Sequence, residues 1–252
     1  MKKIAFYVNS TKPSADATRE RLSVCAQRFG IDVVDAQSGN PDIVVVLGGD
    51  GTMLSAVHKY PGIPLLGLNL GSLGYLASVE EANFDDAIEA IAEGRYGISH
   101  RTALNVCGVN ALNDVVVSRG ASGHAIRMDL SVDGKYATRF VADGLVVATP
   151  TGSTAYSMSA GGPIIDPSLD CFCLTPVCAH TLSARPMLLS ADCTLEIENI
   201  CMREDNTYLT VDGSANYKLL LGDTVRIRRS SVETRMIRFH ESRFFSVLNS
   251  KF

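Results

Sequence analysis

The 252-residue sequence lacks a dominant charge: 23 Lys and Arg residues stand against 27 Asp and Glu residues, and the formal net charge is −4. Proteins that coat nucleic acid or bind membranes through a polybasic surface carry a large positive excess, so this balance argues against both classes. The chain also lacks an apolar run approaching the roughly 20 residues that a membrane span needs. An anionic ligand remains compatible with the balance, because a pocket can be lined by backbone N–H groups.

Secretion and metal-binding signals are missing as well. Residues 2–8 are basic and then apolar, but this stretch is too short for a secretory signal and is interpreted as a first strand. The seven cysteines are odd in number, and Cys171, Cys173 and Cys178 with His180 lack the Cys-x-x-Cys spacing that is usual in zinc sites. We therefore expect reduced thiols, a cytoplasmic protein and no metal site built by the protein itself.

Strand and helix patterns alternate over residues 1–97, which is typical of an open, Rossmann-like α/β sheet. The run at 43–47 is almost continuously apolar, as expected for a strand covered on both faces. Strands are predicted at 4–8, 31–34, 43–47 and 64–70, and helices at 14–29, from about 52 onwards, and at 83–91.

Period-two strands and hairpin turns dominate after about residue 97, and they predict an all-β second domain over 98–240. Asp133-Gly134 separates two such strands by two residues and predicts a tight hairpin. Further antiparallel strands are predicted at 193–198, 208–211, 224–227 and 235–239. Residues 241–252 are too apolar for a free tail and are expected to pack back on the body of the protein.

A glycine-rich motif, Gly48-Gly49-Asp50-Gly51-Thr52, follows the most apolar predicted strand and opens a predicted helix. Glycines let the backbone turn and point N–H groups at a ligand, and the helix N-terminus adds positive partial charge, so phosphate is the natural ligand. A carboxylate at Asp50 disfavours phosphate, because like charges repel. Its presence therefore indicates a chemical task, such as accepting a proton from an attacking hydroxyl or helping to hold a metal ion. A tight turn with a helix-capping Asp explains the pattern equally well.

Small hydroxyl residues and glycines crowd residues 149–162, which follow Asp143-Gly144 and an apolar strand at 145–148. Small residues permit close approach of a flat ligand such as a purine, whose edge the hydroxyls and backbone groups can bind. The alternative is a Ser- and Gly-rich connection between two strands.

Asn113 and Asp114 stand immediately before another apolar strand. Adjacent amide and carboxylate groups suit the two vicinal hydroxyls of a ribose, because they offer a donor and strong acceptors. Taken alone, the pair is better explained as an Asx-type turn that starts a strand.

Together these motifs resemble those of the NAD kinase family, in its compact bacterial form, over most of the chain. The resemblance includes Leu-Gly-Ser-Leu-Gly-Tyr-Leu at 70–76 and His-Thr-Leu-Ser-Ala-Arg-Pro at 180–186. The motif at 48–52 is shared with diacylglycerol and sphingosine kinases, whereas the order of residues in 149–162 is more specific to NAD kinases.

The resemblance implies transfer of the terminal phosphoryl group of ATP, or of polyphosphate, to the 2′-hydroxyl of the adenosine ribose of NAD, with Mg²⁺ accompanying ATP. Asp50 would be the catalytic carboxylate. The phosphate loop would comprise Gly48, Gly49, Gly51 and Thr52. The NAD-binding residues would be Asp50, Gly51, Gly74, Tyr75, Asn113, Asp114, His124, Asp143, Thr151, Ser153, Thr154, Ala155, Tyr156, Ser157 and Ser159.

The resemblance further implies a homodimer or homotetramer formed through the β-rich domain. Because the implied residues come from both predicted domains, we expect the active site in the cleft between them. Three positions depart from the family pattern: Val141 and Ser55 replace basic residues of some relatives, and Ser214 replaces a common Gln. These departures put the phosphate and nicotinamide contacts in question rather than the reaction.

Two other functions are compatible with parts of the pattern. A lipid kinase shares the glycine-rich loop, but residues 149–162 are polar and suit a dinucleotide better than an acyl chain. A non-catalytic dinucleotide sensor could keep every glycine and lose Asp50, so the presence of Asp50 favours an enzyme.

Overall fold

The computed structural model describes residues 1–9, 11–12, 14–71, 74–77, 79–121, 124–180, 184–201, 207–239 and 244–251. The chain divides into two compact units, one formed by residues 1–100 with 234–252 and the other by residues 101–233. Each unit has its own hydrophobic core.

The first unit is built on a six-stranded sheet in the order β2-β1-β3-β4-β18-β5. Its first five strands pair in parallel. The strands are β1 (Lys3–Val8), β2 (Asp32–Val33), β3 (Ile43–Leu47), β4 (Leu65–Leu68), β18 (Thr234–Arg238) and β5 (Gly97–Arg101). The helices are α1 (Ala15–Arg28), α2 (Asp50–Lys59), the 3₁₀ helix η1 (Glu81–Asn83), α3 (Phe84–Glu93) and α5 (Phe244–Lys251).

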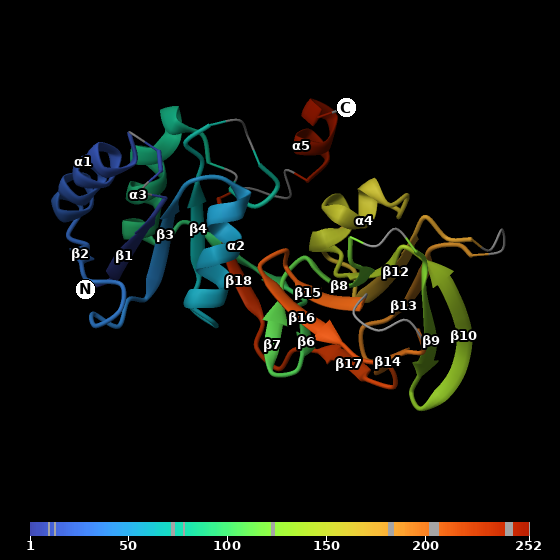
Figure 1. Ribbon diagram of the computed structural model, residues 1–252. Coiled ribbons are helices and arrows are strands. Elements are labelled where there is room, and N and C mark those ends of the chain that lie inside the picture. The colour runs from blue at the N-terminus through green and yellow to red at the C-terminus, as the bar shows by residue number, and fades with distance from the viewer. Residues whose placement is uncertain are drawn as a thin grey trace. The chain divides into compact units, whose positions relative to one another are not determined.

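Helices cover both faces of this sheet, as the apolar run of β3 predicts. Leu22 of α1 and Ile88 of α3 share one buried cluster with Val45 of β3, and Figure 1 shows α1 and α3 side by side. Helix α2 packs on the other face, where a Cβ atom at Gly67 would lie 2.9 Å from Sδ of Met53. The open α/β architecture predicted from the sequence is therefore confirmed.

The second unit is a sandwich of two antiparallel sheets, visible in Figure 1, and it confirms the predicted β-rich domain. One sheet has the order β10-β9-β14-β17-β6-β7 and the other β13-β12-β11-β8-β15-β16. The first sheet comprises β6 (Leu104–Val106), β7 (Val109–Ala111), β9 (Ile126–Val132), β10 (Lys135–Ala142), β14 (Leu195–Asn199) and β17 (Thr224–Arg229). The second comprises β8 (Asp114–Arg119), β11 (Gly144–Ala148), β12 (Cys171–Val177), β13 (Met187–Ser190), β15 (Thr207–Val211) and β16 (Ala215–Leu219).

The alternating side chains of the strands build this sandwich. Val115 of β8, Leu130 of β9 and Phe172 of β12 are buried in the cluster between the sheets. The predicted hairpin is confirmed: Asp133 and Gly134 join β9 to β10 with φ of 50° and 75°. Two short helices, η2 (Thr151–Thr154) and α4 (Tyr156–Ser159), interrupt the otherwise all-β unit.

One strand was assigned to the wrong sheet by the sequence pattern. Residues 235–239 were expected to add an antiparallel strand to the β-rich domain. Instead, β18 pairs in parallel with β4 through Met236 and Leu65, so the chain returns to the first unit. The reason is that Met236 and Ile237 are both buried, and a strand of the α/β sheet is buried on both faces. The C-terminal helix α5 also buries an apolar side chain, because Val247 is only 4% exposed.

Helix α3 supplies a test of the first core. Ile88 is fully buried, whereas Ile98 on β5 is 40% exposed. Ile88→Ala should lower the free energy of unfolding by about 2–5 kcal/mol, because it removes buried methyl groups and leaves a cavity. The same change at Ile98 should cost about 0.5 kcal/mol or less. Urea denaturation measures both, and equal losses would contradict the packing described for α3.

Candidate functional site

The order of the strands marks one edge of the parallel sheet as a ligand site. The chain places β2 on one side of β1 and β3 on the other, so the order of strands reverses between β1 and β3. In open α/β sheets, ligands bind beyond the carboxyl ends of the strands at such a point. The register aligns Val8, Leu47 and Leu68 at this edge, and the glycine-rich loop leaves β3 there.

Close packing explains the first glycine of the loop. A Cβ atom at Gly48 would lie 2.3 Å from Oγ1 of Thr52, so no larger residue fits without displacing the start of α2. A Cβ atom at Gly49 or Gly51 would meet nothing within 4 Å, which shows that the loop borders open space. Helix α2 begins at Asp50 and presents its N-terminus at this edge.

The carboxylate of Asp50 is held by three backbone N–H groups of one distant loop. Oδ2 accepts from Tyr75 at 2.9 Å, and Oδ1 accepts from Leu76 at 2.9 Å and Ala77 at 3.1 Å. A Cβ atom at Gly74 would lie 2.0 Å from Oδ1, so glycine at that position makes the approach possible. A carboxylate has about four acceptor positions, and these bonds leave one on Oδ2 for a further donor.

Two further residues belong to this edge. The phenol of Tyr75 has a pKa above its ordinary value, because burial and then the negative charge of Asp50 disfavour the phenolate. Asn69, directly after β4, is 4% exposed and donates from Nδ2 to the carbonyl of Gly71 at 3.2 Å. Sequence reasoning missed Asn69; a polar residue at the end of a buried parallel strand was the available signal.

In the second unit, Asn113 and Asp114 are held by a second aspartate. Oδ1 of Asp212 accepts from the N–H groups of Asn113 at 2.8 Å and Asp114 at 3.0 Å. Its Oδ2 accepts from the N–H of Leu112 at 2.8 Å. Asp212 itself is 8% exposed. Residues 212–214 resemble the Asp-Gly-Gln motif of many relatives except at Ser214, but this motif does not indicate what Asp212 binds, so the role of Asp212 was missed.

The loop that follows β11, at residues 149–152, packs against the segment at residues 112–114. Thr149 donates from Oγ1 to the carbonyl of Leu112 at 2.5 Å, and its oxygen accepts from the N–H of Gly152 at 3.0 Å. A Cβ atom at Gly152 would lie 2.0 Å from the carbonyl oxygen of Asn113. The structure therefore brings residues 112–114, 149–152 and 212 together, as the combined motifs require.

Asp114 is 6% exposed at the start of β8. Its pKa is raised to about 7, first because burial penalises the charged carboxylate and then because the charge of Asp212 lies nearby. This carboxyl group therefore changes its charge near neutral pH, which is unusual for an aspartate.

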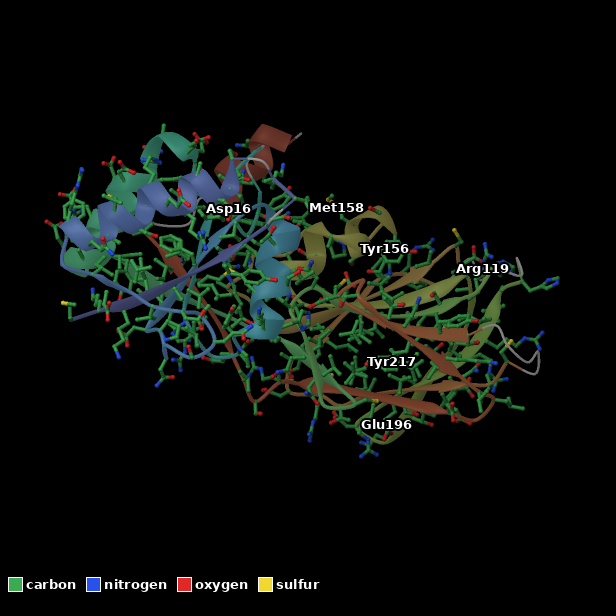
Figure 2. All side chains as sticks on the ribbon, turned by 60° about the vertical axis from the view of Figure 1, so that its left-hand side comes forward. Asp16, Arg119, Tyr156, Met158, Glu196 and Tyr217 are labelled. Carbon is green, nitrogen blue, oxygen red and sulfur yellow. The ribbon has the colours of Figure 1, made fainter. Side chains whose placement is uncertain are left out.

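The serines and threonines of 151–159 divide into structural and accessible side chains. Ser153 is fully buried; its hydroxyl donates to the carbonyl of Pro150 at 2.7 Å and accepts from the N–H of Ile165 at 3.0 Å. Ser157 is also fully buried, 2.9 Å from the hydroxyl of Thr175. These two hydroxyls thus stabilise the loop from within. Thr151 is 8% exposed, Thr154 and Ala155 are half-buried, and Tyr156 and Ser159 are exposed; Figure 2 labels Tyr156 on α4.

The remaining predicted contacts lie elsewhere in the second unit. Asp143 forms an ion pair with Arg119, with 2.9 Å between Oδ1 and Nε; Arg119 is labelled in Figure 2. His124 is exposed. The backbone N–H of His180 donates to the carbonyl of Val141 at 2.8 Å. Residues 72–73 and 181–183 of the two family motifs lie outside the described residues.

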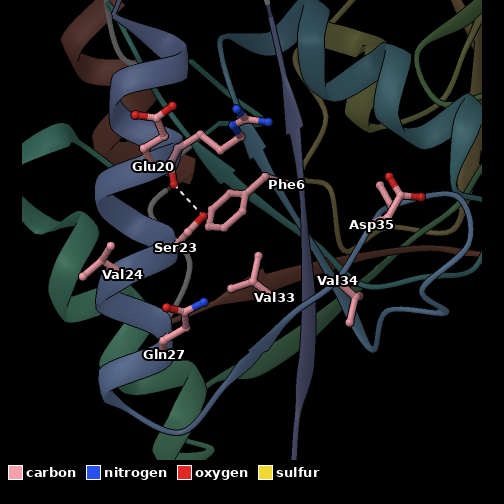
Figure 3. Close-up of a pocket in the computed structure, with 10 residues that line it drawn as sticks. Phe6, Glu20, Ser23, Val24, Gln27, Val33, Val34 and Asp35 are labelled. Atoms are coloured by element: carbon pink, nitrogen blue, oxygen red, sulfur yellow. Dashed lines mark hydrogen bonds between the residues drawn. The ribbon is translucent and has the colours of Figure 1, made fainter.

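A separate pocket of about 420 Å³ lies between α1 and strands β1 and β2. Figure 3 shows Phe6 reaching from β1 toward α1, with Val33 beside it. Its lining residues are Phe6, Arg19, Glu20, Ser23, Val24, Gln27, Val33, Val34, Asp35 and Ala36. None of them is a residue that the sequence motifs single out.

Metal-ligand clusters and membrane-spanning helices are absent from the described residues. Within the described part of the chain, no group of three or more His, Cys, Asp or Glu side chains could hold a metal ion. All seven cysteines are free thiols, and Cys173 is buried beneath the 149–162 loop with Ile165. Among the helices described, none is long and apolar enough to cross a membrane.

An open parallel sheet with a glycine loop at its reversal point, and a carboxylate fixed at the start of the following helix, define a nucleotide-binding α/β protein. Comparison with known proteins narrows this class. Residues 26–96 match the ATP-NAD kinase N-terminal domain, and residues 112–239 match the ATP-NAD kinase C-terminal domain. The chain therefore belongs to the NAD kinase family.

Individual relatives agree with this assignment. The chain is 37% identical to a NAD kinase of Syntrophotalea carbinolica, over 100% of this chain and 98% of the relative. It is 42% identical to a NAD kinase of Geotalea daltonii, over 83% of this chain and 78% of the relative.

Two solved structures are similar over almost the whole chain. The NAD kinase from Archaeoglobus fulgidus in complex with ATP has a TM-score of 0.83 at 26% identity, covering 100% of this chain and 98% of that one. Yeast NADH kinase complexed with NADH has a TM-score of 0.85 at 25% identity, covering 99% and 86%.

The contact between Gly152 and Asn113 can be tested by its effect on stability. Gly152→Ala should lower the free energy of unfolding by about 1–3 kcal/mol, because the new methyl group forces the two backbone segments apart. Gly97→Ala is the matched control, since a Cβ atom there would lie 3.9 Å from its nearest neighbour, the carbonyl oxygen of Arg238. Thermal denaturation gives the melting temperature of both variants. A melting temperature of Gly152→Ala that is no lower than that of Gly97→Ala would contradict the described packing.

Proposed function

We propose that this chain transfers the terminal phosphoryl group of ATP to the 2′-hydroxyl of the adenosine ribose of NAD. As a member of the NAD kinase family, the chain is a phosphotransferase that phosphorylates NAD to NADP. The observation that carries the finer proposal is the carboxylate of Asp50, fixed at the carboxyl end of β3 with one acceptor position left on Oδ2.

Asp50 is the proposed catalytic residue. The oxygen of the 2′-hydroxyl forms a bond to the terminal phosphorus, and the bond from that phosphorus to the bridging oxygen of ADP breaks. Oδ2 of Asp50 accepts the hydrogen bond of the hydroxyl and takes its proton as the new phosphate ester forms. The three N–H donors keep this oxygen in place before the substrate arrives, so little reorganisation accompanies the reaction.

The glycine-rich loop is the proposed phosphate site. The start of α2 carries positive partial charge, and open space at Gly49 and Gly51 leaves room for phosphate oxygens beside the backbone. The divalent ion is proposed to be Mg²⁺ carried by ATP, since Mg²⁺ binds largely through substrate phosphates and waters. The ion would neutralise phosphate charge, while Gly48 and Thr52 shape the loop.

The NAD site is proposed to include Tyr75 beside Asp50, and Asn113 and Asp114 for the ribose and amide groups. Gly74, His124, Asp143, Thr151, Thr154, Ala155, Tyr156 and Ser159 are proposed to contribute further contacts, with Ser153 and Ser157 supporting the loop from within. Tyr156 is 44% exposed on α4, which suits stacking on a flat base. Arg119 neutralises Asp143, so the negative phosphates of NAD meet less repulsion there.

Neither alternative function is favoured. A lipid kinase shares only the loop at 48–52, whereas the two family matches together extend from residue 26 to residue 239. A sensor without catalysis would not need a free acceptor position beside the glycine-rich loop, and Oδ2 of Asp50 retains one.

The cellular location and the oligomeric state of the enzyme are also proposals. The free thiols support a reducing, cytoplasmic location. Exposed apolar side chains in the second unit support assembly into a homodimer or homotetramer. They include Leu188, Tyr217, Leu220 and Leu221, each at least 47% exposed. Sedimentation of the purified protein measures its oligomeric state, and a monomer at micromolar concentration would contradict the proposed assembly.

Asp50→Asn tests the catalytic assignment. It should lower kcat about 10²–10⁴-fold, because the amide cannot take the proton, and raise KM for NAD by a smaller factor, because at least one N–H of residues 75–77 loses its acceptor. Asp42→Asn is the matched control, since Asp42 also accepts a backbone N–H, from Lys3 at 2.8 Å, but is exposed and lies directly before the start of β3. NADP formation is followed with an NADP-specific dehydrogenase, and unchanged turnover in Asp50→Asn would refute the role.

Removal of divalent ions tests the proposed Mg²⁺. Chelation should abolish phosphoryl transfer, because the ATP charge is then unscreened, and added Mg²⁺ should restore it. The melting temperature without ATP should stay unchanged on chelation, since the ion is proposed to arrive with ATP. A large loss of stability on chelation would instead indicate a resident structural metal.

A further inference from the structure

Asp212 lies in the turn between β15 and β16, about 100 positions after the segment it binds. Asp212 and Gly213 adopt φ of 47° and 68°, the left-handed geometry of a tight hairpin turn. From this turn the carboxylate reaches back to the N–H groups of Leu112, Asn113 and Asp114 at 2.8, 2.8 and 3.0 Å. A closing bond runs from the N–H of Asp212 to the carbonyl of Asp114 at 2.9 Å.

These bonds determine the backbone conformation of the Asn113-Asp114 segment. Two of the three donors, Leu112 and Asp114, belong to residues that are themselves buried, and a buried N–H left without an acceptor is costly. The side chains of Asn113 and Asp114 leave this backbone in directions that follow from its φ and ψ. A change at Asp212 therefore alters how both side chains are presented.

We propose that Asp212 is a positioning residue: its carboxylate fixes the backbone that presents Asn113 and Asp114, and thereby sets the affinity for NAD. This inference rests on the proposed function, in which those two side chains bind the ribose and amide groups of NAD. Asp212 itself does not need to touch the substrate.

The charge of Asp212 adds a second, separable effect. Ala148 on β11 pairs with Asp114, Val211 on β15 pairs with Val115, and both are uncharged. Among the described residues, Asp212 is the charged group that acts on Asp114, whose pKa it helps to raise to about 7. The ionised carboxylate accepts stronger hydrogen bonds from ribose hydroxyls, so NAD affinity should rise as pH increases through about 7.

The chain contains a matched control for this position. Asp133 also begins an Asp-Gly hairpin turn, with φ of 50° followed by 75° at Gly134. Its Oδ1 accepts a single backbone N–H, from Thr194 at 2.8 Å, on an exposed part of the other sheet. Asn suits this left-handed turn position as well as Asp does, so Asp212→Asn and Asp133→Asn both preserve the turn.

The experiment compares wild type, Asp212→Asn and Asp133→Asn. Calorimetry measures NAD binding, and steady-state kinetics give KM for NAD and KM for ATP. All are measured between pH 5.5 and about 8.5, a range that brackets the titration of Asp114. Asp212→Asn should raise the dissociation constant and KM for NAD about tenfold at the alkaline end, because one buried N–H loses its acceptor, and leave KM for ATP within about twofold. The pH midpoint of NAD affinity should move to lower pH, because the charge beside Asp114 is gone. Asp133→Asn should match wild type.

Asp212→Asn values that equal those of Asp133→Asn, or equal losses for NAD and ATP without a pH shift, would overturn the inference. If Asp212→Asn does not fold, Asp212→Glu decides: it keeps the charge and both acceptor oxygens but displaces them from residues 112–114, so KM for NAD should rise while KM for ATP stays within about twofold. An unchanged KM for NAD in Asp212→Glu would overturn the inference, whereas a wild-type affinity that is flat with pH would contradict the charge effect. A wild type that binds and phosphorylates no NAD at any pH would instead refute the proposed function.

Discussion

In each unit, the candidate functional residues depend on the same interaction, a carboxylate that accepts three successive backbone N–H groups from a distant segment. Asp50 holds residues 75–77 in the first unit, and Asp212 holds residues 112–114 in the second. In both cases the segment lies next to the end of a buried strand, where ladder bonds stop and backbone donors need another acceptor. The two aspartates thus fix the loops that carry the chemistry, and an ionised carboxylate makes these bonds strong.

The strongest local patterns of the sequence predicted the parts of the structure that depend on neighbours along the chain. The apolar run of β3 indicated a strand covered on both faces, and the glycines after it indicated a tight approach to a helix start. Gly48 is confined by Thr52, four residues later, so its role is local. The family resemblance carried the assignment of the whole chain, and the matches over residues 26–96 and 112–239 confirm it.

Features that depend on distant segments were not predictable from the same patterns. The clamp of Asp212 joins residues 98–100 positions apart, and nothing near Asp212 indicates that its carboxylate points at β8. Ser153 was expected among the NAD-binding residues, yet its hydroxyl bonds the backbone of Ile165 twelve positions later. β18 carries arginines at 235 and 238 around two adjacent apolar residues, which does not decide between the two sheets, and only its pairing with β4 shows that it belongs to the parallel sheet.

The central claim is that a pre-positioned Asp50 receives the 2′-hydroxyl of NAD on the acceptor position left on Oδ2. A crystal structure of the protein with NAD tests this most directly. We expect Oδ2 of Asp50 within hydrogen-bond distance of the 2′-oxygen, about 2.5–3.0 Å, with the bonds from Oδ1 to Leu76 and Ala77 retained. A complex in which the adenosine ribose lies away from Asp50, or in which Asp50 must leave all three N–H donors to reach it, would contradict the account.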